Sequence, residues 1–344
     1  MMYRIAFVGA GGRSGAHADA YQHIDGVELV ACCDLAPDRA EKFGSKYGVK
    51  PYTDIAEMVR AEKPDLVHVV TLPRDRVETM RAVSDLGVPA ATVEKPIATD
   101  VADWRAIREI EKTTRTKFGV CHQFRWQKDL VRCREAIASG ELGKVLFLDG
   151  SAGMTITDQG THCLHYVNSL NGDQPVVGVF GAVHGWDLGN PNHPGPENSE
   201  AYITFADGTR MLWNTGPSAP RVGDPSTTYQ HVRVAAYCER GRVVWEEFGK
   251  WEIAGPNGLE SGSYGDMSVW WANNVLAQAG FHKEMLAWLG DDAKACGTNL
   301  KRSLHEWKAV LALYASALER RPIELASFDP EVGLVEKLRN AMGV

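Results

Sequence analysis

The segment that decides the fold is YRIAFVGAGGRSG, residues 3–15. Its first part, Tyr3–Val8, is a mostly apolar run of the length of a buried strand. A glycine-rich run, residues 9–12, follows at once, and a helical pattern over Ser14–Ile24 comes next. A strand, a tight turn and a helix in this order predict the start of a βαβ unit with a parallel sheet.

The same alternation continues to residue 122. We expect further strands at Val27–Cys33, Leu66–Val70, Ala90–Val93 and Lys117–Cys121. We expect helices at Asp38–Tyr47, Asp54–Ala61, Asp75–Leu86 and Val101–Thr113. Parallel neighbours need a helix to return the chain, so residues 1–122 are predicted to form a doubly wound α/β domain of the Rossmann type.

The pattern changes in residues 123–344. After one helix, Asp129–Ala138, come longer strand-like segments at Val145–Ser151, Val176–Val183, Ala201–Phe205, Arg210–Trp213, His231–Ala236 and Arg242–Glu246. Two stretches rich in glycine and proline, Gly185–Asn198 and Gly216–Thr228, are predicted surface loops. With late helices at Asn274–Leu289 and Leu300–Arg320, these residues predict an α+β domain with a large, mostly antiparallel open sheet.

Composition narrows the functional classes. The chain has 344 residues, which favours two domains, and a net charge of −7. An acidic chain lacks the basic face that nucleic acids and anionic membranes require. The N-terminus lacks the features of a signal peptide, and the seven cysteines have no metal-like spacing. We therefore expect reduced thiols and a cytoplasmic location.

The turn between the first strand and the first helix predicts dinucleotide binding. Gly9 and Gly11 permit a tight turn and close backbone approach to a pyrophosphate, while Ser14 replaces the third small residue of the usual pattern. Gly12 and Arg13 lie in the same turn and are predicted contacts. The alternative is a glycine-rich turn without a ligand.

Asp34 ends the second predicted strand, 23 residues after Gly11. A carboxylate here accepts hydrogen bonds from the adenosine ribose and repels a 2′-phosphate, so NAD is expected and NADP disfavoured. The alternative role, capping the helix that starts near Pro37, is compatible with ribose binding.

Further motifs appear in a specific order. They are Glu94-Lys95-Pro96, His122-Gln123-Phe124-Arg125-Trp126, Ser139-Gly140-Glu141-Leu142-Gly143-Lys144-Val145, Asp158-Gln159-Gly160-Thr161-His162, and Ala312-Leu313-Tyr314 with Arg321-Pro322-Ile323. With the glycine turn and Asp34, they make the chain resemble the glucose–fructose oxidoreductase, inositol dehydrogenase and MocA (Gfo/Idh/MocA) family of oxidoreductases.

The resemblance implies a catalytic group of Lys95, Asp158 and His162. It also implies a homo-oligomer formed through the outer face of the second sheet, and a carbohydrate or polyol substrate. Besides the turn and Asp34, the predicted cofactor contacts are Thr71, Leu72, Arg76, Glu94, Lys95 and Gln123.

The chemistry agrees with these roles. Oxidation of a secondary alcohol needs a base, and His162 suits that role near neutral pH. Lys95 can stabilise a developing alkoxide, and Asp158 can hold His162 in one tautomer. On a helix, His165 shares a face with Asp158 and His162 and is a predicted substrate contact. Substrate contact is also predicted for Arg125 and Trp126, with packing between domains as the alternative.

Two positions depart from the family pattern. Arg76 stands where the family commonly has histidine, and His165 stands where it usually has aspartate. The departure at Arg76 affects how the cofactor ribose is expected to bind. The departure at His165 affects which reaction is expected.

Three other functions stay open. The chain could keep NAD bound and use transient oxidation for an epimerisation, elimination or glycoside cleavage. It could be a non-catalytic dinucleotide sensor, although a sensor needs no acid–base group. It could also bind a metal ion through Asp158, His162 and His165.

Overall fold

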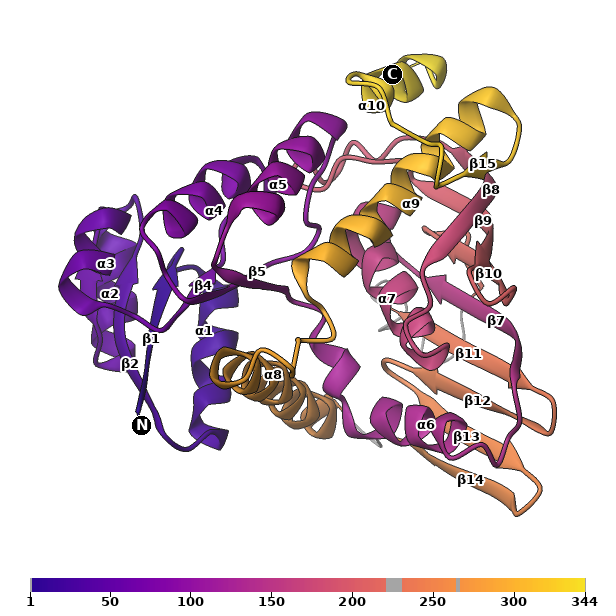
Figure 1. Ribbon diagram of the computed structural model, residues 1–344, viewed down its shortest axis with the longest axis horizontal. Helices are drawn as coiled ribbons and strands as arrows, with labels where there is room; N and C mark the ends of the chain where they lie inside the picture. Colours follow the sequence, from indigo (N-terminus) through magenta and orange to yellow (C-terminus); the bar gives the residue numbers. More distant parts are fainter. Residues whose placement is uncertain (1, 221–230, 264–266, 344) are drawn as a thin grey trace. The chain divides into compact units, whose positions relative to one another are not determined.

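The computed structural model describes residues 2–220, 231–263 and 267–343. It divides the chain into two compact units (Figure 1). The first comprises residues 1–98, 103–126 and 274–304, and the second comprises 99–102, 127–273 and 305–344. The sequence predicts one domain boundary, between residues 122 and 123. The units differ from this division because a late segment, residues 274–304, returns to the first unit.

The first unit contains a six-stranded parallel sheet, in the order β3-β2-β1-β4-β5-β6. The strands are β1 (Tyr3–Val8), β2 (Val27–Cys33), β3 (Lys50–Tyr52), β4 (Leu66–Val69), β5 (Ala90–Val93) and β6 (Lys117–Val120). The helices between them are α1 (Gly12–Ala20), α2 (Pro37–Tyr47), α3 (Ile55–Glu62), α4 (Arg76–Asp85) and α5 (Val101–Thr113). The predicted doubly wound sheet is confirmed; the short strand β3 was not predicted.

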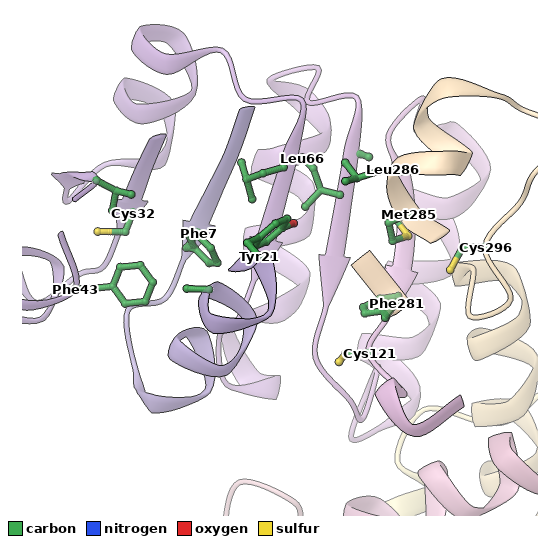
Figure 2. Close-up of a cluster of buried hydrophobic side chains, with 14 of the residues drawn as sticks. Phe7, Tyr21, Cys32, Phe43, Leu66, Cys121, Phe281, Met285, Leu286 and Cys296 are labelled. Atoms are coloured by element: carbon green, nitrogen blue, oxygen red, sulfur yellow. The ribbon is translucent and has the colours of Figure 1, made fainter. Parts of the chain in front are cut away.

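Helix α8 (Met267–Gly290) explains why the late segment belongs to the first unit. Its side chains Phe281, Met285 and Leu286 lie in one buried cluster with Phe7 and Leu66 of the parallel sheet (Figure 2). These apolar side chains bury against the sheet, so the hydrophobic effect holds the C-terminal half of α8 there. Sequence alternation alone does not reveal such a return of the chain.

The second unit is built on a nine-stranded sheet, in the order β14-β13-β12-β11-β7-β10-β9-β8-β15. The strands are β7 (Val145–Ala152), β8 (Val176–His184), β9 (Asn198–Phe205), β10 (Arg210–Thr215), β11 (Val232–Cys238), β12 (Gly241–Glu246), β13 (Lys250–Gly255), β14 (Gly258–Ser263) and β15 (Ile323–Glu324). Only the β7–β10 pair of this described sheet is parallel, so the predicted mostly antiparallel sheet is confirmed.

Four helices belong largely to the second unit: α6 (Lys128–Ala138), α7 (Thr161–Leu170), α9 (Leu300–Glu319) and α10 (Leu334–Ala341). Helix α7 packs against β7 and β11, and α6 packs against β12 and β13. The predicted loop Gly185–Asn198 connects β8 to β9, whereas Gly216–Thr228 lies partly outside the described residues. Within the described ranges, no helix is both long and apolar enough to cross a bilayer.

Candidate functional site

The glycine turn of the first unit has the geometry that a pyrophosphate needs. Gly9 has a φ of +91°, and a Cβ there would lie 2.4 Å from the Val70 carbonyl oxygen, so the turn requires glycine. Ser14 Oγ donates a hydrogen bond to the Gly9 carbonyl, 2.6 Å away, which closes the turn. Ser14 therefore stabilises the loop from within.

The start of α1 is open toward a ligand. Its N-cap, Gly11, provides no side-chain cap. Apart from chain neighbours and the backbone of α1 itself, no atom of the described residues lies within 4 Å of where a Cβ would sit at Gly11 or Gly12. The first N–H groups of a helix and its dipole favour an anion, so this end fits the pyrophosphate of NAD.

Asp34 lies just beyond β2, with its carboxylate held by the protein. Its Oδ2 accepts a hydrogen bond from the Ala10 N–H (2.8 Å), and its Oδ1 accepts one from the Ala36 N–H (2.9 Å). Arg39 donates to Oδ1 through Nε (3.0 Å) and Nη2 (2.8 Å). Burial would raise the pKa of Asp34, but Arg39 and the two amides lower it below its usual value. The carboxylate is therefore ionised beside the turn.

Arg13 is directed to Glu94 at the end of β5. Arg13 Nε lies 2.9 Å from Glu94 Oε1, and its Nη2 donates to Gln278 Oε1 at 2.9 Å. His17 Nε2 approaches the same Glu94 oxygen at 2.7 Å. Burial would raise the pKa of Glu94, but Arg13 and His17 hold it well below its usual value. An ionised, anchored carboxylate thus precedes Lys95, which is joined to Pro96 by a cis peptide bond.

Arg76, the residue that replaces a family histidine, connects two loops. It is 1% exposed, and its guanidinium donates to the carbonyl oxygens of Pro96 and Thr71, the latter at 3.0 Å. Burial lowers its pKa to about 10, although Glu94 and Asp103 oppose this change. The observed contacts of Arg76 are thus with backbone after β4 and β5. Leu72, beside them, is 39% exposed.

The segment after β6 packs against the late part of the first unit. Gln123 is buried, and its Nε2 donates to Asn274 Oδ1 at 3.5 Å. Trp126 packs on the Phe281 ring, with centroids 5.0 Å apart, and donates to Glu284. The Arg125 guanidinium lies directly against Gly297. The contacts described for Trp126 and Arg125 are packing contacts within this unit.

In the second unit, a π-helical turn and α7 carry the other predicted residues. The turn, η4 (Ile156–Gly160), contains Asp158 and continues directly into α7 with His162 and His165. All three side chains are buried, with exposed fractions of 8%, 5% and 0%. Short π-helical turns occur frequently at functional sites.

His162 and His165 have different partners. His162 Nδ1 lies 2.9 Å from the Tyr166 hydroxyl, and their rings are stacked. His165 Nδ1 lies 3.0 Å from both carboxylate oxygens of Glu306 on α9. The carboxylate that residue 165 lacks in comparison with the family pattern is therefore supplied by Glu306. The spacing of four residues could have indicated Tyr166, whereas nothing local in the sequence indicates Glu306.

Asp158 contacts the loop between β8 and β9. Its Oδ2 lies 3.3 Å from Asn190 Nδ2 and 3.3 Å from His193 Nδ1. Both residues were missed from the sequence, because the long loop gives no periodic pattern. In the part of the chain that is described, Asp158, His162 and His165 do not together form a group whose possible metal-ligand atoms lie within 4.8 Å of one another.

Comparison with known proteins agrees with this architecture. A family model described as an oxidoreductase family with an NAD-binding Rossmann fold matches residues 3–122. The D-apiose dehydrogenase of Paraburkholderia graminis is 32% identical over 142 residues, which span 41% of this chain and 38% of that relative. A D-apiose dehydrogenase of Rhizobium rhizogenes is 20% identical over 348 residues, covering 94% of this chain and 97% of its own.

Solved structures extend the likeness to both units. An oxidoreductase from Agrobacterium radiobacter, in complex with NAD+, L-tartaric acid and magnesium, has a TM-score of 0.80 at 18% identity. The match covers 95% of this chain and 99% of that one. At this identity, the comparison establishes a shared two-domain fold.

Proposed function

We propose that this chain, whose residues 3–122 match an oxidoreductase family with an NAD-binding Rossmann fold, is a member of the Gfo/Idh/MocA family and an NAD-dependent dehydrogenase of a sugar or polyol. The reacting group is a secondary alcohol. The observation that carries this proposal is the buried acid–base group on η4 and α7, in a chain whose other unit has an open dinucleotide turn. The D-apiose dehydrogenases among the relatives support the substrate class.

The proposed roles follow from the side chains. The glycine turn and Asp34 would hold NAD, which would supply the hydride acceptor for the substrate carbon. Lys95 is the cation that stabilises the alkoxide as the hydroxyl loses its proton. His162 takes that proton, and the Tyr166 hydroxyl at its Nδ1 fixes the orientation of the ring. Asp158 supplies a negative charge that favours the protonated form of His162 after this transfer.

Anchoring of Glu94 supports the role of Lys95. The carboxylate of Glu94 is held by Arg13 and His17, so the backbone that carries Lys95 starts from a fixed point. Arg76 then binds the carbonyl oxygen of Pro96 on the other side of Lys95. A lysine fixed on both sides is suited to stabilise charge at one position without reorganisation.

The test is a substrate panel with the full-length protein and NAD. We expect D-apiose, myo-inositol or a related polyol to produce NADH, followed by its absorbance, and NADP to work less well. Conversion of the substrate without NADH, seen by chromatography, would favour an epimerase, lyase or glycosidase that uses transient oxidation. Tight NAD binding with no conversion of any compound would favour a sensor.

We also propose that the chain forms a homo-oligomer through the outer face of the nine-stranded sheet. Phe180, Tyr202 and Leu212 are cross-strand neighbours on β8, β9 and β10, and they are 48%, 37% and 45% exposed. An aligned row of exposed apolar side chains on a sheet is typical of an interface. A second copy of the chain is the proposed partner.

A further inference from the structure

The loop between β8 and β9 forms a polar cluster with Asp158. Asn190 Nδ2 lies 3.3 Å from Asp158 Oδ2 and 3.3 Å from His193 Nδ1. His193 Nδ1 in turn lies 3.3 Å from the same Asp158 oxygen. The three side chains are therefore mutual neighbours within the second unit.

One hydrogen bond within the loop and one from the turn η4 hold the loop in place. The Asp187 N–H donates to the Gly195 carbonyl at 3.0 Å, and Thr157 Oγ1 donates to the His193 carbonyl at 2.8 Å. A Cβ at Gly195 would lie 3.0 Å from the Thr157 side chain, so glycine permits this close approach. The loop thus presents His193 from a fixed backbone bound to the turn that carries Asp158.

The cluster determines which nitrogen of His193 carries the proton. The amide nitrogen of Asn190 must face Asp158, because an amide oxygen would repel a carboxylate. His193 Nδ1 lies 3.3 Å from the same Asp158 oxygen, and a carboxylate oxygen can only accept a hydrogen bond. Neutral His193 therefore has its proton on Nδ1, and Nε2, at the other edge of the ring, is an acceptor.

The surroundings of His193 indicate a ligand rich in oxygen. Its Nε2 has no hydrogen-bond partner among the described residues, and its side chain is 20% exposed. The Tyr314 hydroxyl, beside Gly195, is buried and also lacks a partner there. Gln159 Oε1, next to Asp158 in the chain, is likewise buried and has no hydrogen-bond partner among the described residues. Buried polar atoms in this state are costly unless a ligand or water satisfies them.

We infer that His193 is a substrate-binding residue whose Nε2 accepts a hydrogen bond from a hydroxyl group of the sugar or polyol, with Asp158 holding the ring through Nδ1. This inference rests on the proposed function and adds the recognition group. It assigns to the β8–β9 loop a part in substrate specificity.

The kinetic test compares His193→Phe with His193→Gln. Phenylalanine removes the acceptor, whereas the glutamine amide can place its oxygen near the position of Nε2. We expect kcat/KM for the substrate to fall about tenfold to a hundredfold in His193→Phe and to stay within about fivefold of wild type in His193→Gln. The KM for NAD should not change in either. The matched control is His23→Phe, an exposed histidine of the first unit that should behave as wild type.

Equal kcat/KM in His193→Phe and wild type, or equal losses in the phenylalanine and glutamine variants with lowered thermal stability, would overturn the inference. A measurement independent of turnover is ¹⁵N NMR of histidine-labelled protein, which should show neutral His193 with its proton on Nδ1. A proton on Nε2 would also overturn the inference. Absence of turnover by wild type on every compound would reject the proposed function instead, and the NMR result would still decide whether Nε2 is an acceptor.

Discussion

The imidazoles of His17 and His282 lie edge to edge in nearly one plane. His17 Nδ1 is 3.0 Å from His282 Nε2, and the ring planes differ by 16°. His17 Nε2 contacts Glu94, so hydrogen bonds connect α8 through α1 to the carboxylate before Lys95. A third histidine, His68, packs on both rings and contacts Tyr21 and Thr92 through its nitrogens.

This buried network predicts a loss of stability at mildly acidic pH. Burial lowers the pKa of His17, His68 and His282 below the value of an unfolded chain. The unfolded state therefore binds more protons, and the free energy of unfolding should fall as pH drops below about 6.5. Each histidine contributes at most about 1.4 kcal/mol per pH unit. Stability from ionised Glu94, whose pKa is also lowered, should be lost only below about pH 4.5.

Urea unfolding at pH 7.5 and at pH 5.5 measures this effect. His282→Phe removes one of the three groups and should show a smaller difference between the two pH values than wild type. His184→Phe, at an exposed position, is the control and should keep the full difference. An unchanged pH dependence in His282→Phe would show that His282 does not contribute.

Asp34 should determine the preference for NAD. Its ionised carboxylate repels a 2′-phosphate, while Arg39 is held against it at 2.8 Å. Asp34→Ser removes the repulsion and releases Arg39, so the ratio of kcat/KM for NAD to that for NADP should fall about tenfold or more. The double variant Asp34→Ser/Arg39→Ala should lose the gain with NADP. A wild type that prefers NADP would contradict this explanation.

Loss of either proposed catalytic side chain should affect turnover more than folding. We expect Lys95→Met and His162→Asn to reduce kcat about a hundredfold or more, with NAD affinity and thermal unfolding close to wild type. Lys301→Met, at an exposed lysine, is the control. Turnover within a few-fold of wild type would remove the tested residue from the mechanism.

The outer face of the nine-stranded sheet should control self-association. Leu212→Lys puts a charge between Tyr202 and the neighbouring strand β7, where an apolar contact is proposed. Light scattering after size-exclusion chromatography should show a smaller mass for this variant than for wild type. Val332→Lys, at an exposed residue outside the sheet, should leave the mass unchanged. A monomeric wild type would reject the interface.

The parallel sheet could be predicted from the sequence because each of its elements has a local signal. Strand β1, the turn at Gly9 and the residues after it are consecutive, and the strand bounds agree with the sequence alternation. A helix at α7 was expected only through the motif that it carries, and the π-helical turn at Asp158 was not predicted. Strands β13 and β14 have weak apolar alternation, so their patterns did not indicate a strand.

The partners of the predicted site residues could not be found in the same way. Glu306 follows His165 by 141 residues, and Gln278 follows Arg13 by 265. Such contacts depend on tertiary packing, which periodicity does not encode. The sequence predicts that Arg76 contacts the cofactor. It does not indicate that the buried Arg76 side chain binds two backbone carbonyl groups.

His165 is the departure from the family pattern that the structure changes most. The sequence has histidine here where the family usually has a carboxylate. In the structure the carboxylate of Glu306 lies 3.0 Å from His165 Nδ1, and both side chains are buried. His165→Asp would therefore place two carboxylates in contact within a buried site. We expect it to lower the free energy of unfolding by about 3 kcal/mol at pH 7. Because one of the two carboxylates would have a raised pKa, part of this loss should be recovered near pH 5.

The double variant His165→Asp/Glu306→Gln separates charge from shape. It leaves one carboxylate in contact with an amide that can donate to it, so stability at pH 7 should return toward that of wild type. Chemical unfolding at pH 7 and pH 5 measures all three proteins. If His165→Asp is as stable as wild type at pH 7, the His165–Glu306 contact is not a determinant of stability.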